Sequence, residues 1–387
     1  GAATAVINIK LKEASKQKVS GTFGSVIGSN QPQKDNNYAI EDFRNSVSIN
    51  GTLNKFKYLT SFGNQYTNGL SAIAEGSEAD AFNSINGNLK MGYHFSDAFN
   101  LNVYGSFDKF KADFDDGFLF TDADNLATTN QFRIGVSPKI DYKNGSITFN
   151  AAYNNTEREI ASGFPTQFNA ESTVIDAFNK YNFNDTFYTV LGLNIQDNNM
   201  ESFAIPFGET DFEQSINPET AKFKIIDPYA NVVYESEFGL SINAGVRLNN
   251  HSEYGSHFVY SVNPSYKINY DTSYIKGMAS YSTSYITPSL YQLFEPNYGN
   301  ADLKPEENAT LELGVELGIT DKATISLVYF NRREINFIDF VDLGGFVFEY
   351  NNIDEEFTVS GIEIDSNYKL TNKINCRANA TYTNVEE

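Results

Sequence analysis

The sequence lacks tryptophan, has one cysteine and contains no long uninterrupted hydrophobic run. The single Cys376 excludes a disulfide framework and a metal site built from cysteines, because both need several thiols. A membrane-spanning helix needs about 18 or more consecutive apolar residues, and no stretch approaches that length. Helical membrane proteins are therefore excluded. The mean hydropathy of −0.39 still permits strands that face lipid with alternate residues only.

Basic residues are also scarce. The 28 Lys and Arg residues stand against 49 Asp and Glu residues, which gives a formal net charge of −21. A nucleic-acid partner requires a basic surface, so this balance argues against one. The three histidines, His94, His251 and His257, are not spaced as ligands of one metal ion. Gly-x-Ser-x-Gly and phosphate-binding glycine motifs are absent from the sequence, so we do not expect an enzyme.

Aromatic residues are abundant, with 24 Tyr and 32 Phe, and many of them flank short turns. Four of these turns have three residues, most of them polar, between two aromatic residues. They lie at 95–99, 183–187, 234–238 and 270–274. Segments that alternate apolar and polar side chains run on both sides of these turns. In residues 238–249, for example, the apolar side chains occupy the even positions. A period of two predicts strands and excludes helices for these segments.

The alternation predicts about 17 strands and no convincing helix. Globular strands usually have roughly 5–6 residues, whereas a tilted strand needs about 9–11 to cross a membrane. The observed lengths therefore favour a transmembrane barrel over a soluble sandwich. The predicted strands lie near 18–27, 43–53, 56–67, 83–95, 99–110, 130–142, 145–158, 171–183, 187–197, 223–234, 238–249, 257–270, 274–285, 307–317, 323–333, 358–370 and 373–385.

Short turns alternate with long loops along the chain. In outer-membrane barrels the short turns face the periplasm and the long loops face the outside. The predicted long loops lie near 28–42, 68–82, 111–129, 159–170, 198–222, 250–256, 286–306 and 334–357. We therefore predict an all-β fold, a transmembrane antiparallel up-and-down β-barrel. An odd strand count leaves two edges unpaired, which lipid does not tolerate, so we expect further strands beyond Glu387.

Two stretches resemble signatures of TonB-dependent outer-membrane receptors. Residues 281–294, 298–306 and 311–316 are similar to the family's "P-x-L-x-x-L", "G-N-x-x-L-x-P-E" and "E-x-G" patterns, in that order. The opening segment 1–10 resembles the "G-V-I-N-I" strand that ends the plug domain of these receptors. The run 244–294 is most similar to the vitamin B12 (cobalamin) receptor branch. A weaker resemblance links Tyr350–Asn352 and Val359–Ile364 to a late pair of barrel strands.

The resemblance implies a barrel of about 22 strands around an N-terminal plug that carries a TonB-binding box. We expect residues 1–13 to be the last plug strand and residues 14–387 to be a partial barrel. The box, most of the plug and the last strands would then lie outside this chain. The implied location is the bacterial outer membrane, as a multi-pass protein. The implied partners are TonB, through the plug, and lipid with lipopolysaccharide, and a surface lipoprotein is left open.

On the same basis, the expected function is TonB-dependent uptake of a scarce large ligand, cobalamin or a related corrinoid, across the outer membrane. Three alternatives stay open. One is a siderophore or other metal-chelate receptor of the same fold. Another is a surface receptor that binds without import. The last is a soluble secreted all-β protein, which would fold without detergent.

Aromatic residues in the expected extracellular loops are candidates for a ligand vestibule, because rings bind bulky amphipathic ligands well. The candidate ligand-binding residues are Phe118, Phe120, Phe207, Tyr291, Tyr298 and Asn300. Packing within the loops is the competing interpretation. Asn300 also suits a left-handed turn.

Four aspartates within nine positions could bind calcium, which prefers carboxylate and carbonyl oxygens. They are Asp108, Asp113, Asp115 and Asp116. Cobalamin receptors that this chain resembles use loop aspartates from this region for calcium, although the spacing here is not that of an EF-hand. A solvated acidic loop is the alternative. No other cofactor is expected.

Overall fold

The computed structural model describes residues 12–30, 39–73, 79–117, 119–206, 208–320 and 322–386. Its strands are β1 (Ser20–Gly28), β2 (Asp42–Leu53), β3 (Phe56–Thr67), β4 (Phe82–His94), β5 (Phe99–Asp116), β6 (Thr121–Tyr142), β7 (Gly145–Ala161), β8 (Thr166–Asn182), β9 (Phe187–Ala204), β10 (Glu213–Ile216), β11 (Lys222–Glu235), β12 (Leu240–His251), β13 (Gly255–Tyr270), β14 (Ser273–Ile286), β15 (Glu306–Ile319), β16 (Ala323–Ile335), β17 (Ile338–Gly344), β18 (Val347–Asn352), β19 (Phe357–Lys369) and β20 (Asn375–Glu386). A short helix, α1 (Leu290–Phe294), lies between β14 and β15.

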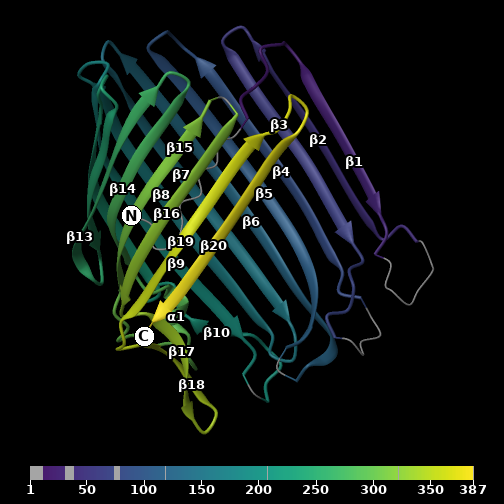
Figure 1. Ribbon diagram of the computed structural model, residues 1–387. Coiled ribbons are helices and arrows are strands. Elements are labelled where there is room, and N and C mark those ends of the chain that lie inside the picture. Colours follow the sequence, from purple (N-terminus) through teal and green to yellow (C-terminus); the bar gives the residue numbers. More distant parts are fainter. Residues whose placement is uncertain are drawn as a thin grey trace.

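Within these described ranges, 18 strands form one antiparallel sheet, and β17 and β18 form a separate hairpin. One of the 18, β10, has only four residues, so seventeen long strands form the wall, as the alternation predicts. Each long strand pairs with the next, with β9 followed by β11 and β16 followed by β19. Figure 1 shows these strands tilted side by side in a sheet that curls round on itself. The predicted all-β barrel architecture is confirmed.

One face of the sheet is apolar and exposed. Apolar side chains on this face meet in register across neighbouring strands, as where Leu313 pairs with Tyr329 and Val315 with Leu327. Leu313 and Leu327 are each 49% exposed, and no second sheet covers them in the described part of the chain. An apolar surface of this extent is unfavourable in water and suits the hydrocarbon of a bilayer.

The other face is concave and polar. Phe168 on β8 contacts Tyr291, in the connection that follows β14, with ring centroids 5.9 Å apart. Strands β9 and β11–β14 lie between these residues in the sheet, so the contact requires the sheet to curl with this face inside. A hollow of about 570 Å³ on the inner face is lined by polar side chains that include Lys90, Arg133 and Asn150.

Several strands are longer than predicted, and three predicted long loops are therefore wrong. The strands β5 to β9 each have 17–22 residues. The corresponding connections shrink to 117–120 and 162–165, and the connection between β12 and β13 shrinks to 252–254. Beyond the apolar band the backbone ladder continues, but water solvates both faces there. In that region the sequence no longer alternates apolar and polar side chains, although the strand continues.

The expectation that no helix is present is wrong at α1, a single turn of five residues. Ser289 caps it, because its Oγ accepts a hydrogen bond from the Gln292 N–H and Gln292 Oε1 accepts one from the Ser289 N–H. This reciprocal pair is a capping box. Five residues are too few to show an apolar period. None of the described helical segments is long and apolar enough to cross a membrane.

The predicted plug strand, residues 1–13, lies mostly outside the described residues, which begin at Lys12. The segment that follows touches the inner wall. The Ser15 N–H donates to Asn50 Oδ1 at 2.8 Å, and Thr52 Oγ1 donates to the Ser15 carbonyl at 2.7 Å. The chain therefore reaches β1 along the inside of the sheet.

Candidate ligand-binding site

Two connections join to form a cap over one end of the sheet. We define the cap as residues 287–305 together with the hairpin β17–β18. Asn300 Nδ2 donates to the Tyr350 carbonyl and to Asn351 Oδ1, each at 3.0 Å. The Tyr350 N–H donates to the Tyr298 carbonyl at 2.9 Å. These bonds make one unit from two segments about fifty residues apart.

Aromatic rings contact one another across the cap. Tyr291 lies between Phe168 of the wall and Tyr350 of the hairpin, with a centroid distance of 6.3 Å to the latter. Phe340 contacts both Tyr298 and Tyr350, at 5.3 and 5.1 Å. The structure thus brings together the candidate residues Tyr291 and Tyr298, with Asn300 beside them. All three stabilise the cap, and their contact with a ligand stays a prediction.

The stability of the cap depends on pH through the phenol of Tyr291. Burial raises the pKa of its phenol from 10.0 to about 12, and the nearby Glu295, Tyr350 and Tyr298 add to this increase. Between these two values the unfolded phenol is ionised and the folded one is not, so stability falls as pH rises from about 10 to 12. We expect phenolate absorbance, compared between the wild type and Tyr291→Phe, to show a group that titrates near 12. A midpoint near 10 would contradict this burial.

Phe120 is not part of the cap contacts. Phe120 lies in the turn 117–120 between β5 and β6, where it is 76% exposed and has a left-handed φ of 51°. Phe118 and Phe207 lie outside the described residues. The role of these three residues in ligand binding stays a prediction.

The four aspartates do not converge. Asp108 and Asp113 lie an odd number of residues apart on β5 and therefore project from opposite faces. Asp115 accepts hydrogen bonds from the backbone N–H groups of Ile73 and Ala123, at 3.1 and 3.2 Å, and so links the β3–β4 connection to the start of β6. Asp116 Oδ1 accepts from the Leu119 N–H at 3.0 Å. Among the residues that the structure describes, no three His, Cys, Asp or Glu side chains form a metal-binding group. Calcium binding stays a prediction.

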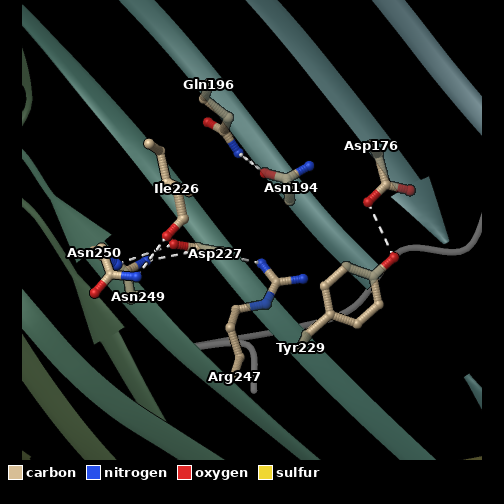
Figure 2. Close-up of polar contacts among 9 residues, drawn as sticks. All are labelled: Asp176, Asn194, Gln196, Ile226, Asp227, Tyr229, Arg247, Asn249 and Asn250. Atoms are coloured by element: carbon tan, nitrogen blue, oxygen red, sulfur yellow. Dashed lines mark hydrogen bonds and ion pairs between the residues drawn. The ribbon is translucent and has the colours of Figure 1, made fainter. Parts of the chain in front are cut away.

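A polar group on the inner wall was not predicted from the sequence. We call it the wall cluster: Asp176 of β8, Asp227 and Tyr229 of β11, and Arg247 and Asn249 of β12. Asp227 is only 1% exposed. Asn249 Nδ2 donates to its Oδ2, and the Asn250 N–H donates to its Oδ1, each at 3.2 Å. The guanidinium of Arg247 lies 3.6 Å from the same carboxylate (Figure 2).

Tyr229 supports the other side of the guanidinium. Arg247 Cζ lies 5.3 Å from the centre of the Tyr229 ring, and the Tyr229 hydroxyl donates to Asp176 Oδ1 at 3.0 Å, as Figure 2 shows. The ring covers Gly192 on β9, its register partner. A Cβ at Gly192 would overlap this ring, so glycine is required for the ring to lie there.

The wall cluster escapes sequence analysis because each member occupies an ordinary polar position on an alternating strand. Strand register alone brings Arg247 opposite Tyr229. A signal was nevertheless present. The sequence has few cations, and Arg247 places one of them in the middle of a polar face of asparagine, serine and glycine.

The fold and the site define a class: a membrane β-barrel with an apolar outer face, a polar interior and a loop cap over one end. Residues 21–387 match the family model "TonB dependent receptor-like, beta-barrel". The chain therefore belongs to the TonB-dependent receptor family, whose members are outer-membrane receptors and transporters. This confirms the resemblance in the signature residues.

The chain is 27% identical over 203 residues to the vitamin B12 transporter BtuB of Vibrio cholerae, an alignment that covers 52% of this chain and 30% of that protein. It is 24% identical over 255 residues to BtuB of Photobacterium profundum, with 64% and 39% covered. The alignments therefore span less than half the length of these curated relatives.

Solved structures share the fold. The siderophore receptor PirA from Pseudomonas aeruginosa has a TM-score of 0.77 and 17% identity, and the match covers 97% of this chain and 68% of that one. The copper transporter OprC has a TM-score of 0.78 and 11% identity, with 97% and 62% covered. At these identities the likeness shows the fold alone.

Proposed function

We propose that this chain forms the barrel of an importer that takes up cobalamin or a related corrinoid across the outer membrane, driven by TonB. The observation that carries the proposal is that the curated relatives, aligned over 52% and 64% of the chain, are vitamin B12 transporters. The barrel would be the wall, its polar face would contact the plug and water, and the cap would close over captured ligand. No covalent step is required.

The proposed ligand is large and amphipathic, which suits the cap. Its inner side presents Tyr291 and Phe168 in contact at the wall, and aromatic surfaces favour ligands of this kind. A siderophore or other metal-chelate receptor is the second candidate that the sequence leaves open. PirA and OprC share the fold at 17% and 11% identity, and fold likeness does not select between the two ligands.

The test is uptake of labelled cyanocobalamin by cells that produce the receptor from its natural gene. We expect uptake to depend on this gene and to fall to background when TonB is deleted. The purified receptor should bind cyanocobalamin with a Kd of about 1 μM or tighter, a binding free energy of roughly −8 kcal/mol.

Ferric enterobactin serves as the comparison ligand in both assays. Binding of the ferric chelate without binding of cyanocobalamin would replace the corrinoid proposal with the second candidate. Binding of cyanocobalamin with uptake that is unaffected by loss of TonB would support a surface receptor without energised import.

A further inference from the structure

Arg247 is a cation held in place on the inner wall. Its side chain is 45% exposed, whereas that of its partner Asp227 is 2% exposed. The carboxylate therefore lies behind the guanidinium, and the Tyr229 ring supports one face of it. An arginine side chain normally has large rotamer freedom, and support on two sides reduces the entropy lost on binding.

The guanidinium has more N–H donors than the described part of the chain provides acceptors for. Arginine carries five N–H donors in a planar fork. Within the described part of the chain, the contacts of Arg247 are the ion pair with Asp227 at 3.6 Å and the cation–π contact with the Tyr229 ring. The distance of 3.6 Å is longer than a hydrogen bond. Within the described residues, the fork therefore has N–H donors left for two parallel hydrogen bonds to a carboxylate or phosphate.

Buried polar atoms without a partner lie on the same strip of wall. Asn198 Nδ2, Asn249 Oδ1 and His251 Nε2 are all buried, and none has a hydrogen-bond partner in the described structure. His251 is 4% exposed, and its Nδ1 accepts from the Glu253 N–H at 3.1 Å. In the neutral ring the proton is therefore on Nε2, which is a donor without an acceptor. Two of these three atoms are donors.

These atoms lie on the stretch of wall that runs from Arg247 toward the connection between β12 and β13. Asn249 and His251 follow Arg247 on the same face of β12. Phe223, the register partner of Asn198, lies against His251 with ring centroids 4.8 Å apart. Buried donors without acceptors are rare in native proteins and mark places where water or a ligand supplies the missing partner. Two of these buried donors, Asn198 Nδ2 and His251 Nε2, therefore have no acceptor within the described residues.

We propose that Arg247 is a recognition point for an anionic group, a phosphate or a carboxylate, on a ligand inside the barrel, and that Asp227 and Tyr229 are its positioning residues. The inference rests on the proposed function in that a ligand enters the barrel. A chain with a net charge of −21 repels anions, so recognition of one requires a local cation that is held in place. For a corrinoid, the matching group is the phosphodiester of cobalamin, which cobinamide lacks.

The first measurement does not depend on the natural ligand. Binding of inorganic pyrophosphate to the purified receptor is followed by broadening of its phosphorus NMR signal. We expect broadening with the wild type and its loss with Arg247→Gln. Arg377→Gln is the matched control, because Arg377 also pairs with a carboxylate but is 72% exposed in its side chain. Equal broadening by the wild type and Arg247→Gln, or none by the wild type, would overturn the proposal.

The second measurement compares cyanocobalamin with dicyanocobinamide. Arg247→Gln should weaken cyanocobalamin binding by about tenfold or more and leave cobinamide binding unchanged. Asp227→Asn should give a smaller loss with the same selectivity, since the cation remains but is no longer held. Equal weakening of both ligands would indicate a purely structural role and would refute the assignment.

Folding is controlled separately. Arg247→Gln leaves Asp227 buried without its cation, so the double variant Asp227→Asn with Arg247→Gln removes both charges and should show the same selective loss. Heat-modifiable migration on SDS gels verifies that each variant is a folded barrel. Should neither corrinoid bind the wild type while pyrophosphate does, the proposed function fails and the anion site stands.

Discussion

Replacing Leu327 by arginine is expected to lower the free energy of unfolding in lipid by about 2–4 kcal/mol, the cost of a cation on the lipid face near the middle of the bilayer. Leu327 lies on the apolar face of β16 and is 49% exposed. In register it pairs with Val315 and Ile364, which are also apolar. The arginine would therefore have no polar neighbour on this face.

The adjacent Ser326 is a matched control at the same depth. It points inward, and its register partners are Glu316 and Asp365, so Ser326→Arg should change stability by less than about 1 kcal/mol. Urea titration of the barrel in lipid vesicles measures both variants. Similar losses of stability for Leu327→Arg and Ser326→Arg would show that both faces of β16 contact the same solvent. The assignment of the apolar face to lipid and the polar face to water would then be wrong.

Replacing Asn300 and Asn352 together by alanine is expected to detach β17–β18 from residues 287–305. Asn300 makes two donor bonds to the hairpin and accepts one from the Asp302 N–H. Asn352 bonds to both the N–H and the carbonyl of Lys304, and to the Asn336 carbonyl. Each bond contributes about 0.5–1.5 kcal/mol, so the combined loss opens the cap.

Hydrogen exchange at the Tyr350 N–H reports the effect, since this group donates to the Tyr298 carbonyl. A loss of roughly 3 kcal/mol corresponds to about a hundredfold faster exchange. Asn297→Ala is the control, because among the described residues the side chain of Asn297 bonds to Glu295 of its own loop and not to the hairpin. If Tyr350 exchanged equally fast in the control and the double variant, the two asparagines would not hold the cap.

The strands were predictable at the end where the turns are short. The predicted turn at 183–187 separates β8 and β9, which end and begin at Asn182 and Phe187. Apolar alternation next to a short polar turn is a local pattern, and burial of one face in lipid enforces it. At the other end the predicted strand 187–197 continues to Ala204, because polar strands in water keep their ladder without keeping the pattern.

The candidate site was predictable only in part. The signature residues Tyr291, Tyr298 and Asn300 do lie together, and their likeness to the family pattern placed them in one loop. Their partner Tyr350 lies about fifty residues further along the chain, and no periodicity relates the two. Asp108, Asp113, Asp115 and Asp116 are close in sequence, yet the strand places neighbours on opposite faces and Asp115 bonds to backbone amides instead.

The sequence by itself determined that this protein is a barrel of long strands with one face in lipid, since a period of two is a property of adjacent residues. It also determined the family, because the short signature motifs can be recognised without an alignment of the whole chain. Only the tertiary structure decided how the two segments of the cap are joined and which residues lie beside Arg247. Those features depend on register and curvature, which bring together residues from strands and loops that carry no common local pattern.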